Sequence, residues 1–172
     1  MKKNTAVILP DGKLGTCIEK IPDLKEHEVM IEVHASLISP GTEMNLARQR
    51  REFPDPNAKE TRFGYSNAGI IVQVKGDVKE LKVGMRVAAM GAGAAEHTNY
   101  AAVPVNLVVP IPDEVTFEQA AYLSLAATSL QAVRRTAPKL GEYGAVLGLG
   151  IVGNLAAQLY QHAAKDRDRQ IA

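Results

Sequence analysis

Three glycines near the end of this 172-residue chain have a spacing that could hold a phosphate group. Gly148, Gly150 and Gly153 form a G-x-G-x-x-G motif between an apolar run at 145–147 and an alanine- and leucine-rich segment. This order predicts a strand, a tight turn and a helix whose N-terminal N–H groups could bind an anion. Gly148 would make the turn, Gly150 would admit a pyrophosphate and Gly153 would let the helix pack closely. The alternative is a purely structural turn.

A complete dinucleotide fold also has an acidic residue about 20 positions after the first glycine. That spacing reaches Asp166 and Asp168, which lie in a charged stretch typical of a solvated helix end or turn. The apolar start of a second strand would come only at Ile171. The sequence therefore predicts the first β-α unit of an incomplete nucleotide domain, since an intact enzyme would need about twice this length.

Composition narrows the class of protein. Lys and Arg number 20 and Asp and Glu 19, so a formal net charge of +1 predicts no binding to nucleic acid or to a membrane surface. Cys17 is the only cysteine, which excludes an internal disulfide and a cysteine-rich zinc site. The N-terminal apolar run ends at Pro10, too early for a signal peptide, and no apolar stretch is long enough to span a membrane. We expect a soluble, cytoplasmic protein.

The first two thirds of the chain have the pattern of short antiparallel strands. Apolar and polar residues alternate, and proline and glycine separate the segments, as in a compact barrel or sandwich. The turn at 10–12 predicts a hairpin. The expected strands are 5–9, 13–21, 28–38, 68–75, 86–90, 98–103 and 107–111.

Two helices are expected among these residues. One covers 43–52, with Thr42 as its N-cap, and is followed by a loop at 53–62. The other is a single long helix over 117–135, which begins at a capping box formed by Thr116 and Gln119. The chain then divides into a barrel at 1–115, a bridging helix and linker at 116–140, and the start of a nucleotide domain at 141–172.

Several short motifs occur in an order that resembles the medium-chain dehydrogenase/reductase superfamily. The motifs are PGTE at 40–43, GYSNAG at 64–69, VGMRV at 83–87, YAAVP at 100–104, AAT at 126–128 and GLGIVG at 148–153. The resemblance covers essentially the whole chain. It implies a GroES-like β-barrel, a bridging helix and the first β-α unit of an incomplete Rossmann domain, a fold that is mainly β with some α.

The chain is most similar to the branch that lacks the usual zinc motifs, which includes dehydrogenase halves of two-part oxidoreductases and enzymes similar to bacteriochlorophyllide dehydrogenases. Where zinc-dependent relatives have their ligands, it has Pro40, Tyr65, Ser66 and Ser124. Proline has no ligand atom, and neutral hydroxyls bind zinc poorly. The four-cysteine structural lobe is also absent between 90 and 100. The resemblance thus implies a zinc-independent enzyme.

The same resemblance implies the catalytic residues. Thr42 matches the hydroxyl that relays the alcohol proton, and Tyr65 would donate a hydrogen bond to the substrate oxygen from the vacated metal position. Glu43 and Ser66 would lie nearby. Each has a structural alternative: Thr42 could only cap its helix, Glu43 could only complement the helix dipole, and Tyr65 could only fill space.

Three further residues have less specific expectations. His97 could act as an acid or base, but its place in a barrel segment favours a structural role, and the same holds for His34. Thr128 matches a position near the nicotinamide in relatives, although packing within its helix would explain it equally well. Together with Ile151 and Val152 of the glycine motif, Thr128 completes the expected cofactor site.

Two functions remain open at this stage. The first is an NAD(P)-dependent oxidoreductase that transfers hydride between nicotinamide and an alcohol, a carbonyl or a related small molecule, and that is inactive as this truncated chain. The second is a non-catalytic GroES-like module that binds a ligand or a partner. The apolar residues of the incomplete nucleotide domain would be left exposed, so residues 141–172 would pair with another copy, giving a homo-oligomer, or be poorly ordered.

Overall fold

The computed structural model describes residues 2–78, 80–139 and 142–169. The chain forms two compact units, Met1–Leu123 and Ser124–Ala172. The first holds the expected barrel strands, and the second holds the glycine motif. The finer division into 1–115, 116–140 and 141–172 stays a prediction.

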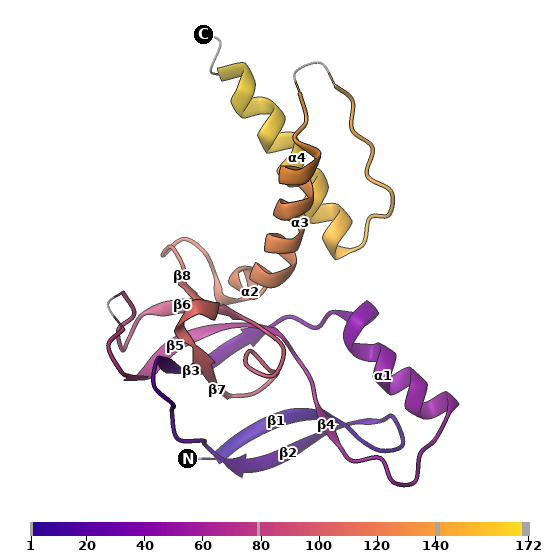
Figure 1. Cartoon of the computed structure of the whole chain (residues 1–172), viewed down its shortest axis with the longest axis vertical. Coiled ribbons are helices and arrows are strands. Elements are labelled where there is room, and N and C mark those ends of the chain that lie inside the picture. Colours follow the sequence, from indigo (N-terminus) through magenta and orange to yellow (C-terminus); the bar gives the residue numbers. More distant parts are fainter. Residues whose placement is uncertain (1, 79, 140–141, 170–172) are drawn as a thin grey trace. The chain divides into compact units, whose positions relative to one another are not determined.

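The N-terminal hairpin belongs to a small antiparallel sheet (Figure 1). Its strands are β1 (Lys2–Ile8), β2 (Leu14–Lys20) and β4 (Thr61–Arg62), in the order β2-β1-β4. The hairpin prediction is confirmed. The prediction of an unbroken loop over 53–62 is wrong at its end, because Thr61 and Arg62 pair with Ile8 and Val7 of β1.

The second sheet has five antiparallel strands in the order β7-β3-β5-β6-β8. Its strands are β3 (Glu28–Ser36), β5 (Ser66–Lys75), β6 (Arg86–Met90), β7 (Tyr100–Pro104) and β8 (Val108–Pro110), with the short 3-10 helix η1 (Val105–Leu107) before β8. These strands confirm the predicted ones to within a few residues. Alternate apolar side chains of the sheet form a buried cluster that includes Val29, Ile31, Ile71, Val87 and Val103.

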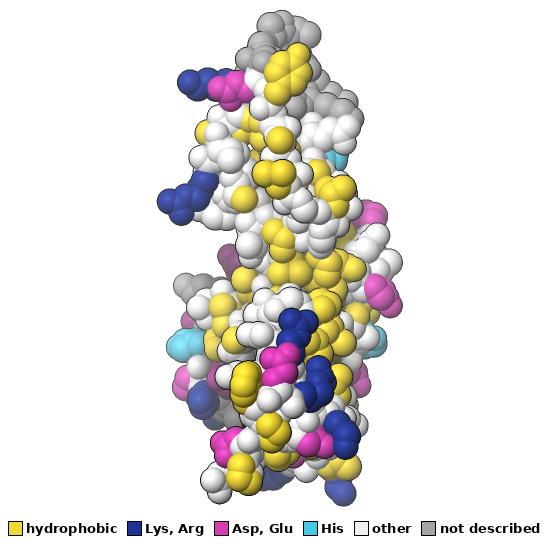
Figure 2. Space-filling model, turned by 90° about the vertical axis from the view of Figure 1, so that its right-hand side faces the viewer, with side chains coloured by type: hydrophobic (Ala, Val, Ile, Leu, Met, Phe, Trp, Pro, Cys, Tyr) yellow, Lys and Arg dark blue, Asp and Glu magenta, His cyan; other side chains and the backbone are white. Residues whose placement is uncertain are grey.

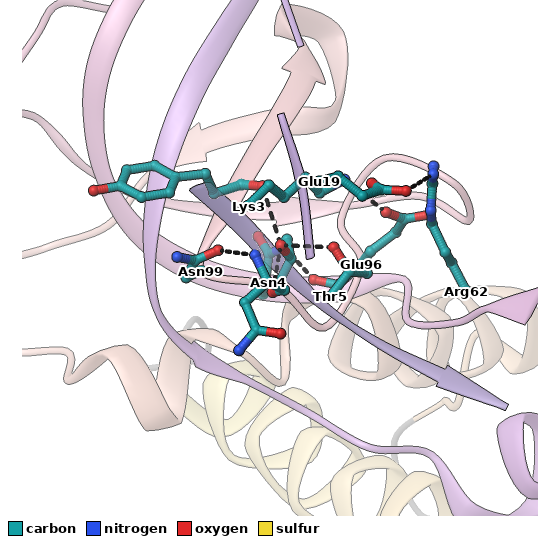
Figure 3. Close-up of polar contacts among 10 residues, drawn as sticks. Lys3, Asn4, Thr5, Glu19, Arg62, Glu96 and Asn99 are labelled. Carbon is teal, nitrogen blue, oxygen red and sulfur yellow. Dashed lines mark hydrogen bonds and ion pairs between the residues drawn. The ribbon is translucent and has the colours of Figure 1, made fainter. Parts of the chain in front are cut away.

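Residues 96–99 join the two sheets. Thr5 of β1 forms an isolated bridge with Thr98, and the Ala6 N–H donates to the His97 carbonyl. In Figure 3, Asn99 also lies beside Asn4, whose backbone N–H donates to the Asn99 side-chain oxygen. The segment before β7 is therefore held against β1.

Helix α1 (Pro40–Glu52) follows β3 directly. It begins earlier than predicted, with Ser39 at the N-cap and proline at the first helical position, where its missing N–H costs nothing. Thr42 is therefore not the N-cap but lies in the first turn, so the prediction of its capping role is wrong. At this helix start, the Glu43 carboxylate accepts a hydrogen bond of 2.5 Å from the Ser39 backbone N–H.

The predicted helix over 117–135 is two helices, α2 (Phe117–Ala120) and α3 (Leu123–Thr136). The predicted capping box of Thr116 and Gln119 is confirmed. The chain turns at Ala121 and Tyr122, where the buried Ser66 hydroxyl donates to the Ala121 carbonyl at 2.6 Å. This side-chain donor takes a carbonyl that a continuous helix would use for its own backbone bonds.

In the second unit, α3 contacts α4 (Ile151–Arg169), and the Ser129 hydroxyl donates to the Val152 carbonyl at 3.1 Å. The helix after the glycines is thus confirmed. The strand predicted at 145–147 is wrong as a strand, because no neighbouring strand among the described residues supplies ladder hydrogen bonds. The second strand expected at Ile171 lies outside the described residues.

The surface has no dominant sign of charge on the face drawn in Figure 2. Basic and acidic side chains are interspersed there with apolar ones. This distribution agrees with the near-balanced composition. Among the residues that the structure describes, no helix is long and apolar enough to cross a membrane.

Candidate functional site

His97 lies at the centre of a buried polar cluster in the first unit. Its Nε2 atom is 3.1 Å from Glu43 Oε1, and its Nδ1 atom is 2.9 Å from Ser36 Oγ. The His97 and Glu43 side chains are only 7% and 4% exposed, whereas Ser36, at the end of β3, is exposed. Phe63 packs edge-on against the imidazole, with ring centroids 4.9 Å apart. Two hydrogen bonds therefore link an exposed hydroxyl, a buried imidazole and a buried carboxylate.

The local sequence explains why Glu43 faces inward. The N-cap at Ser39 fixes the start of α1, so Glu43 lies one turn into the helix. One of its oxygens accepts the Ser39 N–H and the other faces the imidazole. Because a buried carboxylate is costly without partners, both contacts are needed to hold it there.

A buried ion pair lies next to His97 in the chain. Lys3 Nζ is 3.0 Å from Glu96 Oε2, and both side chains are about 10% exposed (Figure 3). The Asn67 amide donates to the Glu96 backbone carbonyl at 3.0 Å, while its own Oδ1 is buried without a hydrogen-bond partner among the described residues. Residues 96 and 97 therefore connect β1, β5 and α1.

The residues predicted to be catalytic have different surroundings in the structure. Thr42 is exposed and Tyr65 is half-buried, and no hydrogen bond joins them in the part of the chain that the structure describes. Ser66 is fully buried with its hydroxyl on Ala121. Glu43 is bound to His97 instead. The structure thus brings Glu43 together with His97, a residue that was not among the predicted catalytic ones.

Sequence reasoning missed Ser36. It was part of an ordinary alternating strand, and nothing in the local pattern distinguished it. His97 was expected to be structural, and its burial agrees with that expectation, but its link to an exposed hydroxyl was not foreseen. The order of the elements was the only indication in the sequence that Ser36 and Glu43 lie near each other. Ser36 ends a strand, and the helix that carries Glu43 begins four residues later.

The glycine motif has the geometry of a tight turn before a helix. Gly148 has a φ of +88°, which L side chains rarely adopt. A Cβ on Gly153 would lie 1.9 Å from the Gly148 carbonyl oxygen, so this position requires glycine. A Cβ on Gly150 would meet no atom within 4 Å, which leaves the backbone there open to a ligand.

Two of the other predicted cofactor residues, Ile151 and Val152, lie in the first turn of α4. Ile151 begins the helix, and Val152 is 41% exposed. Thr128, on α3, is exposed at the residue level, and its hydroxyl donates to the Ser124 carbonyl at 3.0 Å. That bond is typical of a threonine in a helix, so Thr128 shows no feature specific to a nicotinamide.

No group of three or more His, Cys, Asp or Glu side chains that could hold a metal ion is found within the described ranges. Of the four positions where zinc-dependent relatives have ligands, Pro40, Tyr65 and Ser66 lie in the first unit and Ser124 in the second. Zinc independence stays a prediction.

Comparison with known proteins identifies the family. The alcohol dehydrogenase GroES-like domain matches residues 25–113, just over half of the chain. The chain belongs to this family. It is thereby part of the medium-chain dehydrogenase/reductase superfamily, as the short motifs implied.

Two curated relatives indicate the range of activities in the family. The chain is 33% identical over 153 residues to the NADPH-dependent alkenal/one oxidoreductase of Arabidopsis thaliana, covering 83% of this chain and 39% of that protein. It is 28% identical to the (R,R)-butanediol dehydrogenase of Bacillus subtilis, covering 64% of this chain and 39% of that enzyme. The chain thus spans well under half of the length of these relatives.

Solved structures show the same fold. An alcohol dehydrogenase from Escherichia coli in complex with NADH has a TM-score of 0.80 at 18% identity, over 95% of this chain and 54% of its own. The quinone oxidoreductase of Coxiella burnetii has a TM-score of 0.72 at 20% identity, over 94% of this chain and 54% of its own. A GroES-like domain followed by the start of a Rossmann-like fold is therefore the architecture of the chain.

Proposed function

We propose that this chain provides the barrel and the first nucleotide-binding unit of a zinc-independent, NAD(P)-dependent oxidoreductase. The reaction is hydride transfer between nicotinamide and an alcohol, a carbonyl or a related small molecule. The observation that carries the proposal is the turn at Gly148, Gly150 and Gly153, with one glycine at positive φ, one open to a ligand and one in contact with the turn. Oxidoreductases among the relatives support the same function.

The residues of the turn fit a dinucleotide. The backbone N–H groups at Gly150, Ile151 and Val152 come at the start of α4, where the positive end of the helix dipole favours a pyrophosphate. The absence of side-chain atoms around Gly150 supports close approach of the phosphates. Bound NAD(P) would supply or accept the hydride.

Hydroxyl groups, in place of a metal ion, would stabilise the oxygen of the substrate. Thr42 and Tyr65 are the proposed donors, since Thr42 is exposed and Tyr65 is only partly buried. Glu43 and Ser66 are buried and hydrogen-bonded within the barrel, so we assign them to positioning α1 and the turn after α2. The oxygen would be stabilised by hydrogen bonds alone, which are worth most where water is excluded.

The nucleotide part of the proposal is tested by NMR titration of the 172-residue chain with NADPH. We expect amide shifts at residues 150–152 at millimolar NADPH, and no micromolar affinity by calorimetry, because the sheet that completes such a site has about six strands. Gly150→Val should abolish these shifts, whereas Gly41→Ala, which also meets no atom within 4 Å, should leave them unchanged.

Shifts that avoid residues 150–152, or that persist in Gly150→Val, would contradict the proposal. A chain that gives no NADPH response at all would support the alternative of a non-catalytic GroES-like module. Micromolar affinity in the calorimeter would instead show that this chain needs no further strands to bind the nucleotide.

A further inference from the structure

We propose that Ser36 is a nucleophile activated by His97 and Glu43, and that it accepts acyl groups from activated esters. Ser36 Oγ lies 2.9 Å from His97 Nδ1, and His97 Nε2 lies 3.1 Å from Glu43 Oε1. A hydroxyl, a base within hydrogen-bond reach and a third group that orients the base are the components of an activated nucleophile. This activity needs neither a dinucleotide nor a metal, so it is independent of the function proposed above.

The proposal requires an ionised Glu43 and a neutral His97. An ionised carboxylate only accepts, so the bond between Glu43 and His97 then places the proton on Nε2. A neutral imidazole then has its lone pair on Nδ1, which can only accept, so the hydroxyl of Ser36 must donate to it. The second Glu43 oxygen is held by the Ser39 N–H. Every bond in the array thus points from the serine toward the carboxylate.

Burial distinguishes the three residues. The base and the carboxylate are shielded from water at 7% and 4% exposure, while Ser36 is exposed at the end of β3. The imidazole is also fixed by its neighbours, since Phe63 packs against its ring and the His97 N–H donates to the Phe63 carbonyl at 3.2 Å. A reagent in solution can therefore reach the Ser36 hydroxyl, while His97 stays oriented and shielded from solvent.

The step balances without any other reactant. Ser36 Oγ attacks the carbonyl carbon of the ester, and its proton moves to His97 Nδ1. The Glu43 carboxylate stabilises the resulting imidazolium. The carbon–oxygen bond to the leaving group breaks, the proton passes to that group or to solvent, and the acyl group stays on Ser36 as an ester. Nothing is oxidised or reduced.

The ring nitrogens are used in the opposite order from a Ser-His-Asp triad, in which the nitrogen facing the serine is Nε2. The chemistry requires only that the nitrogen facing the serine be unprotonated and that the other one donate to a carboxylate. Both conditions follow from the contacts of Glu43. The exchanged order does not prevent general-base catalysis by His97.

The test is acetylation of the 172-residue chain by p-nitrophenyl acetate, followed by mass spectrometry of its peptides. We expect an acetyl ester on Ser36 that forms at least about tenfold faster than on any other hydroxyl, since general-base catalysis typically contributes about 10²–10⁴-fold. The rate should not keep rising in proportion to hydroxide, because His97, and not hydroxide, takes the proton from Ser36. Ser36→Ala should lose the adduct. Ser39→Ala should keep it, because the Ser39 side chain makes no capping bond.

Two further variants assign the activation to the buried pair. His97→Gln and Glu43→Gln, checked for folding by circular dichroism, should each slow acetylation of Ser36 by about 10²-fold. Equal rates in a folded variant and the original chain would overturn the proposal. No adduct on Ser36, or a rate that keeps rising in proportion to hydroxide, would overturn it as well. The pH profile uses the unaltered chain, so it decides the matter even if both variants unfold.

Discussion

At the scale of single residues, the ion pair of Lys3 and Glu96 should be one of the most sensitive points of the barrel. Both side chains are about 10% exposed, so removing one charge leaves the other buried and unpaired. We predict that Lys3→Met lowers the free energy of unfolding by about 3–5 kcal/mol, measured by urea denaturation. The exposed neighbour Lys2 is the matched control. Lys2→Met should change the free energy of unfolding by less than about 0.5 kcal/mol.

The outcome that would contradict this reading is a similar, small effect of both lysine substitutions. In that case the pair would contribute no more than an exposed surface salt bridge. The buried contacts around Glu96 would then have to be satisfied in another way.

Gly153 gives a second prediction at this scale. Alanine normally stabilises a helix relative to glycine by about 1 kcal/mol, yet here its Cβ would lie 1.9 Å from the Gly148 carbonyl oxygen. We expect Gly153→Ala to distort the turn and to speed amide exchange at the start of α4, because this backbone cannot yield as a side chain would. Gly150→Ala, which meets no atom within 4 Å, is the control and should leave exchange unchanged. Slower exchange in Gly153→Ala would show that the turn is looser than described.

Features that depend on neighbouring residues could be predicted from the sequence, whereas contacts between distant residues could not. The glycine spacing is local, so its turn and helix could be predicted from a few neighbouring positions. The array of Ser36, Glu43 and His97 could not, because its contacts join positions that are 54 and 61 residues apart. Thr42 was predicted to be the N-cap of α1, whereas Ser39 is the N-cap and Pro40 is the first helical residue.

At the scale of elements, α1 is attached to the hairpin by Arg50. Its guanidinium donates to the carbonyls of Ile8, Leu9 and Lys59 and to the Thr61 hydroxyl. We predict that Arg50→Ala lowers the free energy of unfolding by about 2–3 kcal/mol, because it leaves several of these carbonyls without a donor. Arg48 lies on the same helix and is exposed, so Arg48→Ala should cost less than about 0.5 kcal/mol.

Arg50→Lys separates charge from geometry. A lysine keeps the charge but cannot present the forked donors of a guanidinium, so we expect it to recover only a small part of the loss. Full recovery by lysine would indicate that the charge, and not the set of hydrogen bonds, attaches α1 to the hairpin.

Strands were predicted better than helices. Alternation of apolar and polar residues located seven of the expected strands because each strand buries one face in the sheet. The break between α2 and α3 was missed. At that break the Ala121 carbonyl accepts the Ser66 hydroxyl, which lies 55 residues away in the sequence. The run at 145–147 has the composition of a strand, but a strand also requires a partner, which composition cannot reveal.

At the scale of the whole molecule, the resemblance based on motif order predicted the family correctly. The near-balanced charge agrees with the interspersed surface in Figure 2. The family match and the related solved structures confirm the GroES-like domain and the start of a Rossmann-like fold. The substrate could not be predicted, because the motifs that identify the family build its scaffold and do not select a ligand.

The proposed function requires above all that this barrel works without a metal ion. The direct test is the zinc content of the purified chain after expression in zinc-supplemented medium, measured by inductively coupled plasma mass spectrometry, with Cys17→Ser as the control for adventitious thiol binding. We predict far less than one zinc ion per chain, because Pro40, Tyr65 and Ser66 offer a poor ligand set. One zinc ion per chain that Cys17→Ser also retains would contradict the claim.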